Sequence, residues 1–160
     1  MTNIVTFLTY RDRAEEAAAF YCSIFPDARI TNTVPYPDIP PAPHPGAVMI
    51  VELELLGQRY IFLNGGDPFR FTNAISLAVQ CETQDEIDRY WSALSAGGGE
   101  PGVCGWLTDK FGVSWQVMPK QIAELISHDP ARAKRVMDAV MTMAKLDLAT
   151  LQRAAQGPSR

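Results

Sequence analysis

The sequence predicts an α+β protein made of two tandem strand–helix–strand–strand–strand units followed by C-terminal helices. An internal repeat is the first observation, because two segments match at an offset of 70 positions: Thr6 on Ser76, Glu16 on Glu86, and Phe20–Tyr21 on Tyr90–Trp91. Each copy combines a strand pattern with an amphipathic helical pattern, which is the second observation. The third is the change to helical periodicity after Pro119. We expect paired modules over residues 1–120, divided into about 3–70 and 71–119, and a helical extension over 121–160.

Strands of the first unit are expected over residues 4–10, 29–34, 47–55 and 59–64, with a helix over 14–25. The helix carries apolar side chains three and four positions apart, and Pro26 ends it because proline cannot continue a helix. Six prolines occupy Pro35–Pro45, so this segment cannot pair in a sheet. We expect an extended surface loop there.

The second unit is expected to begin with a strand over residues 74–81, whose alternate side chains point to opposite faces. Thr83 and Glu86 have the spacing of a capping box, which predicts the start of a helix. Three glycines at 97–99 end that helix. Residues 104–108 and 113–118 have the pattern of a hairpin.

Helical signals dominate the rest of the chain. A short helix is expected over residues 121–126, and Asp129 followed by Pro130 predicts a longer helix to about residue 144. Asp147 can cap a last short helix. Apolar side chains on the middle helix form a stripe rich in methionine: Val136, Met137, Val140, Met141 and Met143. This stripe packs against the body of the protein or against a second copy, and we expect a homodimer.

Composition and charge narrow the functional classes. The chain has 160 residues, of which 47% are hydrophobic and 20% charged, as in ordinary globular proteins. Its net charge of −4 disfavours a nucleic-acid-binding protein, and no apolar run is long enough to span a membrane. Three cysteines without C-x-x-C spacing favour a reducing compartment, so we expect a cytoplasmic protein.

Long motifs in the sequence resemble a known family. The segments RAEEAAAFYCSIFPDARI, LNGGDPFRFTNAISLAVQC, DEIDRYW and CGWLTDKFGVSWQVMP are similar to the PhnB-like group of the vicinal oxygen chelate superfamily. This superfamily includes glyoxalase, bleomycin-resistance proteins and extradiol dioxygenases, and the PhnB-like group is often labelled 3-demethylubiquinone-9 3-methyltransferase-like. The resemblance covers about residues 4–143. It implies that the two units form a curved, mostly antiparallel, cup-shaped sheet with the ligand on its concave side.

Metalloenzymes of the superfamily hold a divalent ion with residues from the first and last strands of each unit. The resemblance carries these positions to Thr6, Asn64, Ser76 and Gln116. Two hydroxyls and two amides supply no anionic ligand and no imidazole, and such a set binds a divalent ion weakly. We therefore expect a degenerate metal site and no cofactor, with a weakly bound divalent metal as the alternative.

The same four polar residues could instead line a small-molecule pocket. The aromatic and sulfur-containing side chains that we expect near them in the cup are Tyr10, Tyr60, Phe62, Trp106 and Met118. The competing interpretation is that all of these side chains only fill and satisfy the interior of the sheet.

Two further side chains are candidate catalytic groups. Glu54 should face Arg59 across a tight turn as an ion pair, whereas Glu52 lies opposite Ile61 and could act as a general base or metal ligand, or simply be exposed. Cys104 could be a reactive thiol, but we expect a buried and inert cysteine, as also for Cys22 and Cys81.

The proline-rich loop of residues 35–46 joins two strands that should border the cup. It could close over a ligand, with Tyr36 and Ile39 reaching over the mouth and His44 at the rim, or it could be only a spacer.

Three functions remain open at this stage. The first is a small-molecule-binding protein of the PhnB-like type, and the second is a metal-dependent lyase, isomerase or oxygenase that uses Gln116 and Glu52. A methyltransferase is the third, but neither Gly65–Gly66 nor the glycines at 97–99 lie between a strand and a helix, as a nucleotide-type cofactor turn would require.

Overall fold

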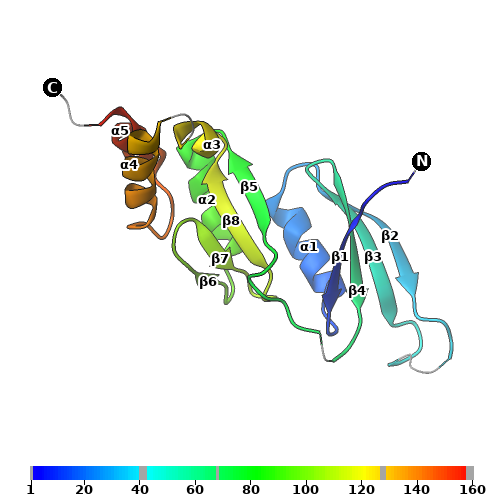
Figure 1. The fold of residues 1–160 in the computed structure, drawn as a ribbon. Coiled ribbons are helices and arrows are strands. Elements are labelled where there is room, and N and C mark those ends of the chain that lie inside the picture. Colours follow the sequence, from blue (N-terminus) through cyan, green and yellow to red (C-terminus); the bar gives the residue numbers. More distant parts are fainter. Residues whose placement is uncertain (1, 40–42, 68, 127–128, 158–160) are drawn as a thin grey trace. The chain divides into compact units, whose positions relative to one another are not determined.

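A computed structural model describes residues 2–39, 43–67, 69–126 and 129–157 of the chain (Figure 1). The chain divides into two compact units, residues 1–70 and 71–160. The C-terminal helices thus belong to the second unit. None of the helices in the described ranges is long and apolar enough to cross a membrane.

The first unit has the predicted βαβββ order. Its elements are β1 (Thr6–Tyr10), α1 (Ala14–Ile24), β2 (Arg29–Pro35), β3 (Val48–Leu55) and β4 (Gln58–Asn64). The sheet has the strand order β1-β4-β3-β2, in which β1 and β4 are parallel and the other pairs antiparallel. One face is covered by α1, where Tyr21 packs edge-on against Phe62 of β4 with ring centroids 5.7 Å apart.

The second unit repeats this arrangement. Its elements are β5 (Leu77–Cys81), α2 (Gln84–Leu94), β6 (Glu100–Pro101), β7 (Trp106–Thr108) and β8 (Ser114–Pro119), followed by α3 (Ile122–Leu125), α4 (Pro130–Val140) and α5 (Leu148–Gln156). The strand order is β5-β8-β7-β6, again with one parallel pair, β5 and β8. The α+β class and the paired βαβββ units are therefore confirmed. The short strand β6 was not predicted.

Helix starts follow the predicted caps. Thr83 and Glu86 form the capping box of α2, and Asp129 and Asp147 accept backbone hydrogen bonds at the starts of α4 and α5. Helix α4 ends at Val140, earlier than predicted. The backbone carbonyls of the next residues accept hydrogen bonds from the loop before β7, which holds that segment out of the helix.

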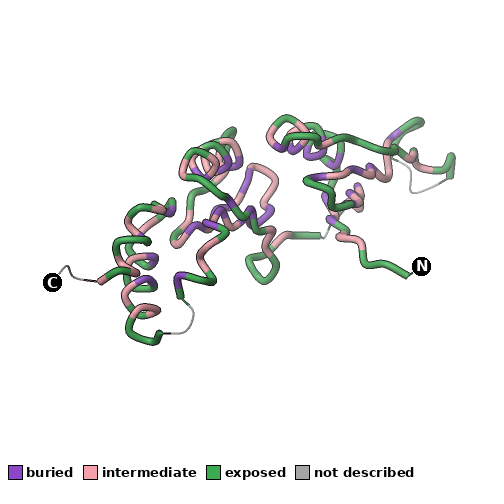
Figure 2. Tube along the Cα trace, turned by 90° about the horizontal axis from the view of Figure 1, so that it is seen from above, coloured by how far each residue is buried: buried purple, intermediate pink, exposed green. Residues whose placement is uncertain are grey.

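Each unit has its own buried core (Figure 2). In the first unit, Leu53, Phe62 and Tyr21 are fully buried between the sheet and α1. In the second, a cluster of Leu125, Val136, Val140, Leu146 and Leu151 joins the three C-terminal helices. Burial of each such side chain contributes about 1.5–3 kcal/mol to stability.

The repeat has two offsets rather than one. Helices α1 and α2 start at Ala14 and Gln84, which is an offset of 70, but β1 and β5 start at Thr6 and Leu77, which is an offset of 71. Three residues separate strand and helix in the first unit and two in the second. A shift of one residue moves every side chain to the other face of a strand. The predicted equivalence of Thr6 and Ser76 is therefore wrong, since Thr6 corresponds to Leu77.

Candidate functional site

Each sheet has a face covered by its helix and an opposite face, here called the open face. In the first unit, Thr6, Tyr60, Phe62 and Asn64 lie on the helix-covered face. The ladder pairs Thr6 with Tyr60, and the rings of Tyr60 and Phe62 lie with their centroids 6.5 Å apart next to α1. Tyr10 lies on the same face, with its ring 5.1 Å from that of Phe62. Tyr10, Tyr60, Phe62 and Asn64 are buried, whereas Thr6 on the same face is half-buried. A role of these side chains in a ligand cup stays a prediction.

Asn64 has a structural role that the sequence analysis missed. It is 8% exposed, and its Oδ1 accepts a 2.8 Å hydrogen bond from the backbone N–H of Ala14 at the start of α1. Its Nδ2 donates to the carbonyl of Val48 at 2.9 Å and to the carboxylate of Glu15 at 2.7 Å. The side chain thereby ties β4 to β3 and to α1. Strict alternation with Tyr60 and Phe62 was the signal that could have placed it on the buried face.

The second unit places its predicted residues differently. Gln116 lies on the open face opposite Trp106 in the β7–β8 ladder. Its Nε2 donates a 2.7 Å hydrogen bond to the hydroxyl of Ser76, directly before β5. Both side chains are half-buried. The structure thus brings Ser76 and Gln116 together as a neutral polar pair and places Trp106 on the same face.

Met118 is on the open face of β8 but does not extend this polar pair into a larger site. It packs against the cluster formed by the C-terminal helices, together with Cys104 and Met143. Met118 thus contributes to packing, and its expected role as a ligand contact stays a prediction.

Glu52 and Glu54 lie on the open face of the first unit in two ion pairs. Arg59 pairs with Glu52, and Arg29 pairs with Glu54, whereas the sequence predicted an Arg59–Glu54 pair. Asn32 also donates to Glu52 at 3.3 Å. The hydrogen bonds from Arg59, the larger cause, and from Asn32 lower the pKa of the Glu52 carboxyl. A carboxylate held in its ionised form by these partners is a weak general base near neutral pH.

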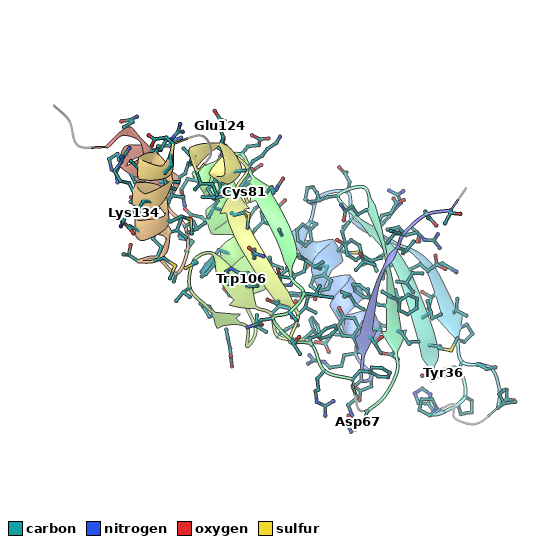
Figure 3. All side chains as sticks on the ribbon, viewed as in Figure 1. Tyr36, Asp67, Cys81, Trp106, Glu124 and Lys134 are labelled. Atoms are coloured by element: carbon teal, nitrogen blue, oxygen red, sulfur yellow. The ribbon has the colours of Figure 1, made fainter. Side chains whose placement is uncertain are left out.

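A hollow of about 650 Å³ lies at one end of the first unit. Its polar lining comes from the β1–α1 connection, the first turn of α1, the proline-rich loop, and the end of β4 with the residues after it: Arg11, Asp12, Glu15, Tyr36, His44, Asn64 and Asp67. Figure 3 shows Tyr36 and Asp67 at the same end of this sheet. The hydroxyl of Tyr36 donates to the carbonyl of Asn64, and Arg11 pairs with Asp67 at 3.5 Å.

The proposed lid residues therefore separate into two groups. Tyr36 and His44 line the hollow, whereas Ile39 is 62% exposed and is not part of its lining. Residues 40–42 of this loop lie outside the described residues.

The three cysteines are free thiols. Burial raises the pKa of the Cys81 thiol to about 11, and it also raises the pKa of Cys22, so neither is an activated nucleophile. Cys22 and Cys104 were expected to be buried, but both are half-buried; the Sγ of Cys104 lies 3.6 Å from the Sδ of Met141.

The donor set does not fit a tightly held divalent metal. On the open faces, the offset of 71 makes Val5 the counterpart of Ser76, and Ile61 the counterpart of Gln116 in the parallel ladders. Val5 and Ile61, the first-unit counterparts of Ser76 and Gln116, have hydrocarbon side chains, which cannot bind a metal ion. No cluster of three or more His, Cys, Asp or Glu side chains suited to a metal ion occurs in the described ranges.

The tandem βαβββ units, each with one parallel strand pair and one helix-covered face, define a protein of the vicinal oxygen chelate class, the fold of glyoxalase and bleomycin-resistance proteins. The sequence profile of 3-demethylubiquinone-9 3-methyltransferase matches residues 2–118, and the chain belongs to this family, the PhnB-like group of that class.

Three solved structures illustrate the relationship. The PhnB protein from Bacillus cereus is 32% identical, with a TM-score of 0.60, covering 73% of this chain and 99% of that one. Protein PA1353 from Pseudomonas aeruginosa is 20% identical, with a TM-score of 0.62 and coverage of 74% and 98%. The fosfomycin resistance protein FosX from Listeria monocytogenes is 17% identical, with a TM-score of 0.50 and coverage of 73% and 91%, and shows the shared fold. A search of curated proteins found no match.

The family description names methyl transfer. The described residues, however, do not form the kind of site with which a protein of the doubly wound fold binds a nucleotide-type methyl donor. Such a cofactor needs a glycine-rich turn between a strand and the following helix. Here β1 leads to α1 through residues 11–13 without glycine, and β5 leads to α2 through Glu82 and Thr83. No step of a reaction is therefore assigned to such a cofactor.

Proposed function

We propose that this protein binds a small neutral molecule on the open face of its second unit and holds no resident divalent metal. The observation that carries the proposal is the Gln116–Ser76 hydrogen bond of 2.7 Å on the face that also presents Trp106. A few fixed polar groups beside apolar surface are typical of small-molecule sites.

The chemistry of the pair indicates the class of ligand. The bond between Gln116 and Ser76 uses one amide hydrogen, so Oε1 of Gln116 can accept and the hydroxyl of Ser76 can donate to a ligand. Both groups are uncharged. The proposed ligand therefore has a carbonyl, amide or hydroxyl group and an apolar or aromatic body that contacts Trp106.

A thermal-shift screen of neutral aromatic carbonyl compounds, followed by calorimetric titration of the hits, tests this assignment. Gln116→Leu removes both the donor and the acceptor, and we expect the affinity for a hit to fall about tenfold or more, which is about 1.4 kcal/mol. Gln152→Leu on α5 is the matched control, because Gln152 is exposed on a different element. Equal affinity of the wild type and Gln116→Leu for every hit would contradict the proposed site.

The hollow of the first unit is the alternative location for the same function. Its volume lies in the range of ligand pockets, and Asn64 fixes the carboxylate of Glu15 at its wall. Glu15→Gln changes the charge of this hollow and alters no residue of the second unit. A hit whose affinity depends on Glu15 and not on Gln116 would place the ligand in the hollow.

Metal binding is tested separately from ligand binding. Protein purified without a metal-affinity resin and dialysed against Mn²⁺, Ni²⁺ or Zn²⁺ should retain far less than one ion per chain. This follows from a donor set of neutral oxygens and hydrocarbons. Stoichiometric retention would instead favour a metal-dependent lyase, isomerase or oxygenase.

The proposal also includes a cytoplasmic homodimer. Three free cysteines suit a reducing compartment. Met137 on α4 and Met141 directly after it are 42% and 66% exposed, while Val136 and Val140 are buried. Light scattering at micromolar concentration should give twice the chain mass. Met137→Lys should shift the protein toward the monomer, whereas a monomeric wild type would contradict the dimer.

A further inference from the structure

The hollow at the end of the first unit has a surplus of negative charge that a neutral ligand would not use. Its volume of about 650 Å³ lies within the range of small-molecule pockets. Three carboxylates line it, those of Asp12, Glu15 and Asp67, against the single guanidinium of Arg11. The lining therefore has a formal charge of −2 when His44 is neutral.

Ion pairs compensate only one of the three carboxylates. Asp67 pairs with Arg11 at 3.5 Å and with Arg70 at 3.2 Å. In the part of the chain that the structure describes, no ion pair involves Asp12 or Glu15. A cleft lined by uncompensated charge of one sign attracts and concentrates ligands of the opposite sign. The charge of the hollow thus indicates a cationic ligand.

Glu15 is the carboxylate whose position is fixed. The Nδ2 of Asn64 donates to Oε2 of Glu15 at 2.7 Å. Asn64 is only 8% exposed and is itself held by hydrogen bonds to the backbone of Ala14 and Val48. The other carboxylate oxygen, Oε1, can accept hydrogen bonds from a ligand. An acceptor that is already fixed lowers the entropy lost when a ligand binds.

The rest of the wall is largely apolar. Tyr36, Pro43, Ala47 and Val48 line the hollow, and Figure 3 shows Tyr36 at this end of the sheet. The hydroxyl of Tyr36 donates to the carbonyl of Asn64, which holds the ring at the wall. Such side chains contact the apolar body of a ligand, and the face of an aromatic ring attracts a cation. Among the described residues the carboxylates do not form a cluster suited to a metal ion, so an organic cation matches the hollow better.

We propose that the hollow binds a primary amine with a short apolar or aromatic body. The ammonium group has three N–H donors, and Oε1 of Glu15 accepts one of them in a charge-assisted hydrogen bond. The carboxylate of Asp12 adds attraction, and the body of the amine contacts Tyr36 and Val48. This site is separate from the Gln116–Ser76 pair, because it lies in the other unit and takes a charged ligand. It does not depend on the function proposed for that pair.

Calorimetric titration of the full chain with benzylamine, phenethylamine and 1,4-diaminobutane tests the site. At least one of these amines should bind the wild type with one molecule per chain. Glu15→Gln should lower its affinity about tenfold or more, since the charge is lost. The fold should be kept, because the amide oxygen of the new side chain can still accept from Asn64. Affinity for benzyl alcohol, the uncharged analogue of benzylamine, should be the same in the wild type and in Glu15→Gln.

Glu16→Gln is the matched control for the loss of charge. Glu16 is the next residue of α1, but it pairs with Arg13 at 2.7 Å and does not line the hollow. This variant and Gln116→Leu should bind the amine like the wild type. Asp12→Asn should weaken binding about threefold or more, and it keeps the test valid if urea unfolding shows that Glu15→Gln is unstable.

Each outcome decides the proposal. No binding of any of the amines by the wild type would overturn it, as would equal affinities of the wild type, Glu15→Gln and Asp12→Asn. Equal losses in Glu15→Gln and Glu16→Gln would show general attraction to an acidic surface and would also overturn it. A loss confined to Gln116→Leu would place the amine in the second unit and contradict the site. Failure of neutral compounds to bind at Gln116 would leave the expected amine results unchanged.

Discussion

Asn64→Ala should destabilise the protein by about 3 kcal/mol, and the structure gives the reason. The substitution leaves the backbone N–H of Ala14 without its side-chain acceptor in a fully buried position, which costs about 1–3 kcal/mol. The hydrogen bonds to Val48 and Glu15 are also lost, each worth about 0.5–1.5 kcal/mol. Water can partly replace the hydrogen bond to the exposed Glu15. The expected loss of about 3 kcal/mol therefore lies in the lower half of the range that these contributions span, about 2–6 kcal/mol.

Urea unfolding followed by far-UV circular dichroism measures this loss. Asn32→Ala is the matched control, because Asn32 is exposed and both bonds of its side chain, 3.3 Å to Glu52 and 2.9 Å from the N–H of Thr33, lie at the surface, where water can replace them. Its loss should cost about 0.5 kcal/mol or less. All three tryptophans, Trp91, Trp106 and Trp115, belong to the second unit, so their fluorescence reports that unit separately. Equal stabilities of Asn64→Ala and Asn32→Ala would refute the assigned role of Asn64.

Three other perturbations follow from the contacts. Asp109→Asn should cost about 1–3 kcal/mol in urea unfolding, because an amide N–H₂ would replace the carboxylate oxygen that accepts the 2.8 Å bond from the Trp115 indole; an unchanged midpoint would contradict this. Hydrogen bonds from Lys145, the larger cause, and from Gln84 lower the pKa of the Asp88 carboxyl. The stabilisation by the ionised carboxylate is therefore present above the ordinary pKa of 3.8 and is lost as the pH falls through the lower pKa of the folded protein. Lys145→Met should therefore lower the urea midpoint at pH 7 and have less effect in acid, and a pH-independent difference would count against the pair. Replacing residues 37–45 with a short Gly-Ser linker should lower the affinity of a ligand bound in the hollow about tenfold, whereas unchanged affinity would make the loop only a spacer.

Local signals in the sequence predicted most of the fold. The capping box at Thr83 and Glu86 and the N-caps at Asp129 and Asp147 depend on neighbouring residues only, and all of them were confirmed. The proline-rich segment was expected to stay out of the sheet, but Pro35 is the last residue of β2 and pairs with Val48, and the N–H of Tyr36 donates to the carbonyl of Ala47 at 2.8 Å. Helix caps and proline positions depend on residues that are close together in the sequence.

The candidate site was harder to predict because it depends on strand register. The repeat was aligned on its helices, and the strand–helix turn is one residue shorter in the second unit, which moved Thr6 to the wrong face. The partners of Glu52 were missed for a related reason. Arg59 lies opposite Glu54 in the ladder, but its long side chain reaches diagonally to Glu52, while Arg29 of β2 takes Glu54. The pairing of β2 with β3 is a non-local contact that the sequence does not show.

The ¹H–¹⁵N spectrum of the protein, titrated with a thermal-shift hit, tests the binding site most directly. We expect saturable shifts of the Gln116 side-chain amide and of the Trp106 indole N–H, since both lie on the open face of β7 and β8. The backbone signals of Gly65 and Gly66 beside the hollow should stay in place. Shifts confined to those glycines, with Gln116 and Trp106 unchanged at saturation, would contradict a ligand site on the second unit.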